Sequence, residues 1–530
     1  MHLRILVTLI SLVLLVNSTW TSIKVKSVTE YGSQTSNVTS VSRDGGSSVL
    51  INNRIIWLYD DTESLSTDGD QLAFVSNSAA YANAANENIR AVEDYEVIKS
   101  GKDKNGNQQW AIIGNVTAPD GRGWIPLLPQ EVEFNNQSKG LQRLALWPGA
   151  NPTPINGTSA FLFTPIVLVT VDPSDPSGIF QSDGMALISL SAPSSGPLAT
   201  RIGSAIFLAN EVPFGGFASI LGTASLSTAS QRPSNDQDVY LLGKTDYGLQ
   251  LARVPLTNLS SFNAYTFFDP LTHDFTTTAP NRNTTSASQL YLSGSFSSGS
   301  LFYSPYFSTF ILIYFTNLAD STFYVRFLDL SAPLNTASED WPPNGKNGTG
   351  ISASSAEALA HYAWSPPQPL YKSPPGTGGY NYAAFAHPEY FNRQYFPPSF
   401  YIPEAPTCDK RNEWFGTGII SESAAGGDGK HILLSWTEQE AKGSIGYQIK
   451  LVKVEFDAIS YGKNGIMQPK PNATNCDSSR GYVQPSKGSI SRPPSLFLGG
   501  EYAFDGNSGI VGLVGCILGV LVTWSLVLWR

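Results

Sequence analysis

Short apolar runs rich in β-branched and aromatic residues recur along the chain, separated by polar stretches rich in Gly, Pro, Asn and Ser. The clearest runs are Ser159 to Val171, Met185 to Leu190, Asp238 to Leu242, Phe310 to Phe315, Phe323 to Leu328 and His431 to Trp436. Runs of this kind bounded by turn residues predict β-strands. The clearest helical candidates, Ala79 to Val92 and Ala356 to Tyr362, are short. Many strands with no helical layer between them predict an all-β sandwich, barrel or propeller.

Length favours the propeller. Residues 19–505 remain once a segment at each end of the chain is set aside. A single sandwich rarely needs so long a chain, whereas roughly four to eight four-stranded blades take it up readily. We therefore predict an all-β fold with a single β-propeller over residues 19–470, followed by a Ser/Pro/Gly-rich stalk over residues 471–505.

The first of these terminal segments is typical of secretory signals. An apolar run from Ile5 to Val16 follows Arg4, and Val16 and Ser18 are small enough for the positions before a signal-peptidase cut. A short apolar run with a positive flank and a small-residue exit predicts a cleaved signal peptide over residues 1–18. An uncleaved anchor is the alternative.

The second segment, Ile510 to Trp529, is uncharged and mostly apolar, and only Arg530 follows it. Its length would span a bilayer as a helix. A membrane-spanning protein usually carries a cytoplasmic basic cluster behind its span, and one arginine is a poor one. The small residues of Asp505-Gly506-Asn507-Ser508 suit attachment of a glycosylphosphatidylinositol (GPI) anchor. Residues 506–530 are therefore interpreted as a GPI signal, with a transmembrane helix as the alternative.

Composition fits an ordered, loop-rich extracellular protein. Charged residues make up 14% of the chain, against about 25% in typical soluble domains. Aromatic residues make up 12%, which argues against disorder. The net charge of −9 and the lack of a basic cluster argue against a nucleic-acid partner.

Glycosylation and disulfide signals agree with export. The chain contains several Asn-x-Ser/Thr sequons, which are acceptors for N-linked glycans. Together with a signal peptide, they predict a eukaryotic glycoprotein with the sequon segments on its surface. Cys516 lies in the C-terminal tail, and Cys408 and Cys476 are expected to pair in an oxidising compartment. The eight mature-chain sequons are at Asn37, Asn115, Asn136, Asn156, Asn258, Asn283, Asn347 and Asn472.

The segment from Ser42 to Thr62 predicts a hairpin that gathers acidic residues. Asn52-Asn53 stands between two β-rich runs, and asparagine tolerates the positive φ of two-residue hairpin turns. An unbroken ladder around this turn would place Asp44 opposite Asp61. Like charges directly opposite destabilise a sheet, so we expect Gly45-Gly46 to bend the first strand and adjust the spacing.

Two interpretations of these acidic residues are open. In the structural one, Asp60-Asp61-Thr62 forms a strand-end turn and Asp44 caps a loop. In the catalytic one, the crowded carboxylates form the acid pair of a glycoside hydrolase, whose separation distinguishes retention from inversion of configuration. Crowding of like charges raises at least one pKa, which acid–base chemistry requires.

Several motifs of this chain resemble a family of secreted fungal and bacterial proteins long filed as a domain of unknown function. Its characterised bacterial relatives are endo-D-arabinanases, and the resemblance runs from about Val38 to about Phe456. It implies a five-bladed propeller similar to the arabinanase, xylosidase and invertase clan. The motifs are Arg43-Asp44-Gly45-Gly46-Ser47, Trp57-Leu58-Tyr59-Asp60-Asp61-Thr62, Tyr303-Ser304-Pro305-Tyr306-Phe307, Gly243 to Arg253 and Asn381 to Phe391.

The resemblance implies Asp44 and Asp61 as catalytic residues. This chain has Asp60 where the family pattern leads us to expect glycine, which adds a charge beside the site. Strand alternation predicts that the Asp60 side chain points to the other face, so that its loss would matter less. A third acidic group is usual in propeller glycosidases, and the candidates are Asp246, Asp320 and Glu389.

Substrate contacts are expected mainly from side chains of the same motifs. Aromatic platforms for sugar rings could come from Trp57, Tyr59, Trp124, Trp147, Tyr303, Tyr306, Tyr380, Tyr382 and Tyr395, although most aromatic residues in β-proteins are core. The predicted substrate-binding residues are Arg43, Asp60, Trp57, Tyr303, Tyr306 and His387.

No metal or cofactor is assigned. The mature chain has four histidines with no close pair at ligand spacing, no Gly-x-Ser-x-Gly elbow and no nucleotide fingerprint. A calcium ion held by carboxylates and carbonyls stays open.

The sequence is compatible with three functions. The first is a cell-surface glycoside hydrolase acting on a polysaccharide, with arabinofuranose-containing polymers among the candidates. The second is a non-catalytic glycan-binding propeller, and the third is a structural or adhesive surface glycoprotein. The expected partners are a polysaccharide or glycan, and the membrane through the C-terminal lipid anchor.

Overall fold

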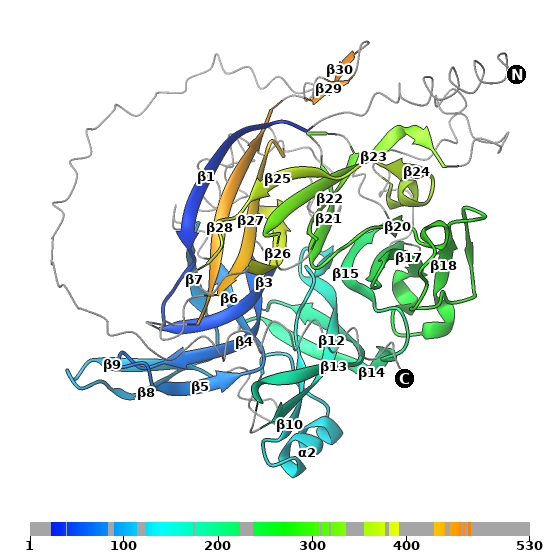
Figure 1. The fold of residues 1–530 in the computed structure, drawn as a ribbon. Coiled ribbons are helices and arrows are strands. Elements are labelled where there is room, and N and C mark those ends of the chain that lie inside the picture. Colours follow the sequence, from blue (N-terminus) through cyan, green and yellow to red (C-terminus); the bar gives the residue numbers. More distant parts are fainter. Residues whose placement is uncertain are drawn as a thin grey trace, which may run out of the picture.

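Five mostly antiparallel sheets surround a common axis in the computed structural model of this chain (Figure 1). The sheets are the blades of a propeller, and we number them along the chain. The structure describes residues 23–467 apart from 39, 53, 83–88, 114–122, 173–174, 194–195, 223–236, 305, 308, 317–319, 335–354, 377–380, 392–428, 440–445, 458 and 462–464.

The strands of each blade follow one another from the axis outward. Blade 1 contains β3 (Val41–Ile51), β4 (Arg54–Leu65), β6 (Ser78–Ala82), β7 (Ala91–Asp94) and β2 (Thr35–Ser36), with β5 (Gln71–Val75) beside β4. Blade 2 contains β11 (Thr153–Asn156) and β10 (Gln142–Leu146) along β12 (Ser159–Asp172), then β13 (Asp175–Ser191) and β14 (Leu198–Phe207). Blade 3 contains β15 (Phe214–Leu221), β16 (Asp238–Lys244), β17 (Gly248–Pro255), β18 (Thr266–Asp269) and β19 (Asp274–Thr276), with β20 (Leu292–Ser293) beside β17.

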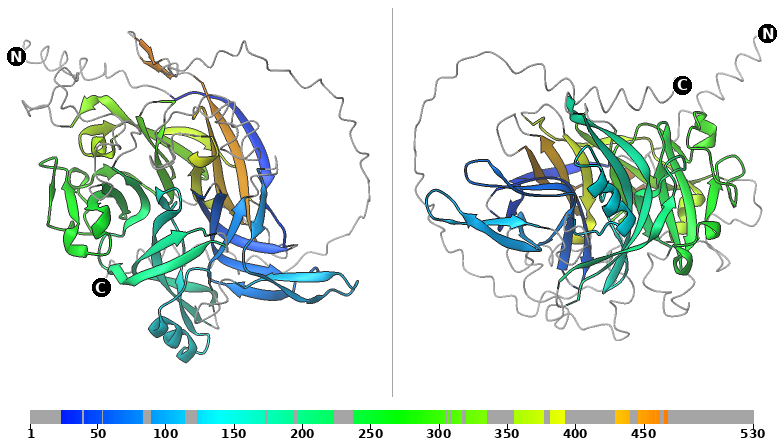
Figure 2. Two further views of the ribbon diagram at one scale, coloured as in Figure 1. Left: turned by 180° about the vertical axis from the view of Figure 1, so that it is seen from behind. Right: turned by 90° about the horizontal axis from the view of Figure 1, so that it is seen from below.

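Blades 4 and 5 follow the same plan. Blade 4 contains β21 (Gly299–Ser304), β22 (Thr309–Phe315), β23 (Thr322–Pro333) and β24 (Tyr362–Trp364), with β25 (Gln368–Lys372) beside β23. Blade 5 contains β26 (Asn381–His387), β27 (His431–Gln439), β28 (Tyr447–Phe456) and β1 (Val25–Ser33). Two further hairpins stand outside the blades: β8 (Val97–Lys102) with β9 (Gln108–Ile112), which extends from blade 1 in Figure 2, and β29 (Ile459–Tyr461) with β30 (Gly465–Met467).

Apolar side chains hold the blades together in a closed ring. One buried cluster joins each pair of neighbouring blades: 1 to 2, 2 to 3, 3 to 4, 4 to 5, and 5 back to 1. In β4, Ile56 and Leu58 face blade 2 while Ile55, Trp57 and Tyr59 face blade 5. Because both faces of such a strand are buried, its sequence is a continuous apolar run and not an alternating one.

The two ends of the chain close blade 5. The N-terminal strand β1 pairs antiparallel with β28 and is the outer strand of the blade that β26 begins (Figure 1). The all-β, five-bladed propeller predicted from the sequence is thereby confirmed, and each of the six predicted strands lies within an observed strand.

The helix predictions succeeded less well. The segment predicted as a helix from Ala79 to Val92 begins as strand β6 and ends in β7, because Ala79, Ala80 and Ala82 pair with the neighbouring strands β4 and β7 of blade 1. Of the second predicted helix, Ala356 to Tyr362, the residues Ala356–Ala360 form a short 3₁₀ helix, and Tyr362 begins strand β24. The α-helix α2 (Pro129–Gln137) was missed because it is largely polar.

The inner strands run in the same direction along the axis. Tyr382 of β26 bonds to Asp44 of β3, and His387 further along β26 bonds to Ser48 further along β3. We call the end at which the inner strands start the front face and the opposite end the back face. The second strand of a blade, counted from the axis, runs antiparallel to the inner strand. Strands such as β4 therefore end at the front face.

Several predicted features fall outside the described residues. These are the signal peptide, the cysteines Cys408 and Cys476, the stalk and the tail after residue 505. In the part of the chain that the structure describes, no helix is long and apolar enough to cross a membrane.

Candidate active site

The β3–β4 hairpin carries three aspartates to the front face. Its register follows the predicted turn at Asn52, with Ile51 opposite Arg54 and Val49 opposite Ile56. Further from the turn, the pairing register shifts twice, and the second shift cancels the first. As a result, Gly45 lies opposite Tyr59 and Arg43 lies opposite Thr62. The first shift adds a residue to β3 and the second adds one to β4. The expected bend at Gly45-Gly46 is therefore present, and Asp44 and Asp61 do not form a directly opposed pair.

Both glycines of the bulge are needed. Gly45 and Gly46 have φ values of +83° and +97°, which L-residues with side chains rarely adopt. A Cβ atom at Gly45 would lie 2.9 Å from the backbone nitrogen of Asp60 and 3.0 Å from its carboxyl carbon. The missing side chain thus leaves the space that the Asp60 carboxyl group occupies.

Asp44 is held toward blade 5. The Tyr382 hydroxyl donates a hydrogen bond to Asp44 Oδ2 at 2.7 Å, and Thr437 Oγ1 accepts one from the Gly45 amide at 3.1 Å. Burial, together with the charge of Asp61, raises the pKa of Asp44 to about 7. Its other oxygen, Oδ1, has no hydrogen-bond partner among the described residues. Asp44 can therefore hold a proton at mildly acidic pH and release it near neutrality.

Asp61 is held toward blade 2 instead. Arg143 Nη2 donates to Asp61 Oδ2 at 2.6 Å, and the Trp147 indole N–H donates to Oδ1 at 3.0 Å. Burial raises the pKa of Asp61, while the Arg143 charge and these two hydrogen bonds oppose the rise. The side chain is 28% exposed. The ionised form of Asp61 thus has two hydrogen-bond donors, one of them a cation, and contact with solvent.

Asp60 joins the cluster, contrary to the alternation expected from the sequence. The residue added to β4 breaks alternation, and the Asp60 carboxyl lies against Gly45 beside Asp44. Burial, and then the charges of Asp44 and Asp61, raise the pKa of Asp60 well above its ordinary value. Asp60 is therefore the third acidic group that the structure brings to the pair.

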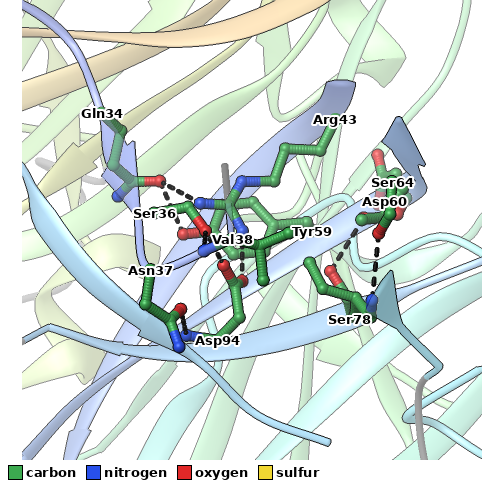
Figure 3. Close-up of polar contacts among 12 residues, drawn as sticks. Gln34, Ser36, Asn37, Val38, Arg43, Tyr59, Asp60, Ser64, Ser78 and Asp94 are labelled. Carbon is green, nitrogen blue, oxygen red and sulfur yellow. Dashed lines mark hydrogen bonds and ion pairs between the residues drawn. The ribbon is translucent and has the colours of Figure 1, made fainter. Parts of the chain in front are cut away.

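Arg43 was predicted to contact substrate, but it is buried in blade 1 (Figure 3). Its Nη1 lies 2.5 Å from Asp94 Oδ1, and its guanidinium carbon lies 3.9 Å from the centre of the Tyr59 ring. Gln34 Oε1 accepts hydrogen bonds from both Arg43 and Tyr59. Arg43 therefore ties β3 to β7, since a buried charge needs a partner.

His387 and Glu389 lie in a buried network behind the aspartates. His387 Nδ1 is 2.5 Å from Ser48 Oγ, its Nε2 is 2.7 Å from Ser435 Oγ, and Glu389 also bonds to Ser48. The side chains of His387 and Glu389 are 0% and 1% exposed. Neither is available to a substrate in this structure, so the predictions of Glu389 as an acid and His387 as a substrate contact are corrected.

Trp57, Tyr303 and Tyr306 are also away from the aspartates. Trp57 is completely buried and packs on His387. Tyr303 and Tyr306 lie at the end of β21 and in the turn after it, at the back face. Their positions follow from packing between blades, which the motif could not reveal. Of the six predicted substrate contacts, only Asp60 lies with Asp44 and Asp61.

The remaining acidic candidates are at the front face but in other blades. Asp246 is exposed in the turn between β16 and β17. Asp320 lies between β22 and β23 and accepts hydrogen bonds from Thr316 and Thr322. These contacts hold Asp320 within blade 4.

Most of the sequons that the structure describes are on the surface. Asn37, Asn136, Asn258 and Asn283 are exposed, and Asn156 is half-buried. Asn115, Asn347 and Asn472 lie outside the described residues.

Sequence reasoning missed the groups that surround the aspartates. Arg143 and Thr437 belong to no motif. Trp147 and Tyr382 were named among nine aromatic candidates, with no role beside the aspartates. They reach the site because blades 2 and 5 flank blade 1 in the closed ring. Within the described residues, no group of three His, Cys, Asp or Glu side chains has the arrangement to hold a metal ion.

Comparison with known proteins identifies no family. No family model matches the sequence, and no curated protein matches it. Among solved structures, a candidate hydrolase from Bacteroides ovatus ATCC 8483 matches with a TM-score of 0.39 and 11% identity over 78% of this chain and 85% of its own. A protein of unknown function from Dyadobacter fermentans DSM 18053 matches with a TM-score of 0.32 and 8% identity, over 81% of this chain and 100% of its own.

A third solved structure is a subtype N11 neuraminidase-like protein of A/flat-faced bat/Peru/033/2010 (H18N11). It matches with a TM-score of 0.29 and 8% identity, over 82% of this chain and 94% of its own. Similarities this distant carry no argument about the chemistry of the site. That chemistry has to follow from the residues of this chain.

Proposed function

We propose that the protein is a glycoside hydrolase whose reacting groups are the front-face aspartates of blade 1. The observation that carries the proposal is the contrast between two neighbouring carboxyl groups. Asp44 has a pKa raised to about 7. Burial raises the pKa of Asp61 as well, but the Arg143 guanidinium at 2.6 Å opposes that rise and favours the carboxylate. A glycosidase needs such a contrast, with one protonated acid and one ionised carboxylate.

The roles follow from the partners. Asp44 donates its proton to the departing glycosidic oxygen as that bond breaks. Asp61, as the carboxylate, either attacks the sugar carbon or removes a proton from the attacking water. The raised pKa of Asp60 favours its protonated form next to Asp44, which limits the negative charge of the cluster. For the substrate, we propose a polysaccharide that contains arabinofuranose. This choice of sugar is supported by the family resemblance of the sequence.

The decisive experiment is hydrolysis of a polysaccharide panel by the purified ectodomain, followed as released reducing ends. Asp44→Asn and Asp61→Asn keep the side-chain shape and remove the titrating group. Each is expected to lower turnover about a hundredfold or more, with the melting temperature at the assay pH nearly unchanged. Asp68→Asn is the matched control, because Asp68 is exposed and pairs with Lys104 on the surface.

Two results would contradict the proposal. One is full activity in both Asp44→Asn and Asp61→Asn. The other is binding of a polysaccharide by the wild-type protein without release of reducing ends, which would favour the glycan-binding alternative. The partly exposed Trp147 and Tyr382 rings beside the aspartates are the feature that supports that alternative.

The place of action is proposed from the sequence. Export, glycosylation and a lipid anchor would put the enzyme on the outer cell surface, where polysaccharides occur. Release of the protein from intact cells by a phospholipase specific for phosphatidylinositol tests the anchor. A mature protein that still contains residues 510–529 would rule the lipid anchor out.

A further inference from the structure

The extended part of blade 2 carries apolar side chains beside Asp61. Arg143 of β10 is opposite Val169 of β12, which is opposite Phe180 of β13. Residues directly opposite each other in neighbouring strands project from the same face of a sheet. The other face of these strands packs on the helix α2 through Leu144 and its neighbours. Arg143 and Phe180 thus mark the face that α2 does not cover.

Two aromatic rings gather on this face. Beneath them lies a small buried cluster that Trp147 packs against, formed by Ala145, Val167 and Val169. The Trp147 and Phe180 ring centres are 5.5 Å apart. Phe180 is 37% exposed, and Trp147 is partly exposed although its indole N–H is bonded to Asp61. An aromatic surface therefore begins at the carboxylate itself.

Blade 1 adds a third ring, which lies against the Arg143 side chain. Phe74 of β5 is 40% exposed, and its ring lies 5.0 Å from the Arg143 guanidinium carbon. Arg143 Nη2 donates to Asp61, and the Arg143 side chain is 24% exposed. The guanidinium therefore brings a positive charge to the edge of the aromatic surface. Apolar rings beside polar groups are the combination that a sugar ring needs, with its C–H face and its hydroxyl edge.

We propose that Trp147 and Phe180, beside Arg143, form a saccharide-binding subsite on the Asp61 side of the active site. The sugar next to the cleaved linkage lies on the Trp147 ring, and the saccharide chain continues over Phe180. The ligand is therefore a saccharide of at least two units, held beyond the reacting bond. The assignment rests on the proposed function for its place beside the reacting groups, but it concerns binding, which can be measured separately.

The test measures binding in an Asp44→Asn background, so that the ligand is not consumed. Retardation in gels containing soluble arabinan, arabinogalactan, xylan, galactomannan or β-1,3-glucan gives apparent affinities. Phe180→Ala is expected to weaken binding about tenfold for whichever of these polysaccharides retards the parent. Phe180→Tyr, which keeps the ring, is expected to bind like the parent. Leu271→Ala, at a site that is 63% exposed in blade 3, controls for the loss of an exposed apolar side chain.

Thermal unfolding of each variant shows that the fold is kept. Equal retardation of the parent and Phe180→Ala would overturn the subsite, and so would a parent that none of the five polysaccharides retards. These outcomes differ from a failure of the proposed function. If Phe180→Ala weakens binding but the wild-type protein releases no reducing ends, the subsite stands and the hydrolase proposal falls. If hydrolysis depends on Asp44 but not on Phe180, the reverse holds.

Discussion

At the scale of single residues, three aspartates of one hairpin differ because their partners differ. Asp44 receives one hydroxyl hydrogen bond from Tyr382, Asp61 receives a guanidinium and an indole donor, and Asp60 has an oxygen with no partner among the described residues. Identical side chains thereby obtain different tendencies to hold a proton. Such differences between neighbouring groups are typical of sites that carry out acid–base chemistry.

The raised pKa of Asp44 predicts how stability depends on pH. Its pKa is 3.8 ordinarily and about 7 in the folded protein, so the folded state holds the proton more tightly between these values. Stability that depends on this group is therefore present at low pH and is lost as pH rises from 3.8 toward 7. Asp44→Asn should remove about 1–2 kcal/mol of the decline between pH 5 and pH 8, after allowance for solvent screening.

Denaturant unfolding of the wild-type protein and Asp44→Asn at both pH values checks this expectation. Asp68→Asn, on the exposed surface, should leave the decline unchanged. A decline of equal size in the wild-type protein and Asp44→Asn would mean that Asp44 titrates normally in the folded state.

At the scale of elements, the double bulge of the β3–β4 hairpin decides which side chains meet. Without the shifts at Gly45-Gly46 and at Asp60-Asp61, Asp44 and Asp61 would be directly opposed and Asp60 would point away. With them, each aspartate turns toward a different neighbour. The bulge is thus the local structure on which the site depends.

Gly45→Ala tests the bulge. A methyl group there meets both a φ of +83° and the Asp60 backbone at 2.9 Å, so we expect a destabilisation of about 2–3 kcal/mol and at least a tenfold loss of hydrolysis. Gly69→Ala is the matched control, because its φ is +90° and nothing lies within 4 Å of the added atom. That variant should lose only about 1 kcal/mol and no activity. Similar losses in both variants would show that only backbone strain matters at Gly45.

At the scale of the whole molecule, a single edge strand closes the ring. β1 completes blade 5 by pairing with β28, so the cluster between blades 5 and 1 depends on residues far apart in the sequence. Asn151, just before β11, adds a polar link near the axis. Its side chain bonds to the Ser48 amide, the Ser300 hydroxyl and the Ala386 carbonyl, which belong to blades 1, 4 and 5.

Proline substitution in β1 should weaken the whole propeller. Successive N–H groups of an edge strand point alternately toward and away from its neighbour, so Val28→Pro combined with Thr29→Pro removes at least one ladder hydrogen bond. We expect the melting temperature to fall on the order of 5 °C in one cooperative transition. Ile98→Pro combined with Lys99→Pro in β8, which closes no blade, should change it little. A β1 variant that melts like the wild-type protein would show that β1 does not secure the ring.

Local sequence determined the strands and the first hairpin, because burial on both faces requires long apolar runs and Asn52 accepts the turn. The meeting of Asp44 with Asp61 at one end of a hairpin was likewise predictable, and length favoured a propeller, but the number of five blades came from the family resemblance. Tertiary structure decided which groups surround them. Arg143, Trp147 and Tyr382 reach the aspartates only because blades 2 and 5 flank blade 1.

Ring closure also decided which predicted side chains a substrate could reach. Trp57 and His387 belong to motifs that resemble functional ones, but packing between blades 1 and 5 buries them. Arg43 is buried by its contacts with Asp94 and Tyr59 within blade 1. A motif records that residues are neighbours along the chain, whereas exposure depends on what the rest of the chain places over them. Because the contacts between blades 5 and 1 join residues more than three hundred positions apart, no pattern within one strand could have revealed them.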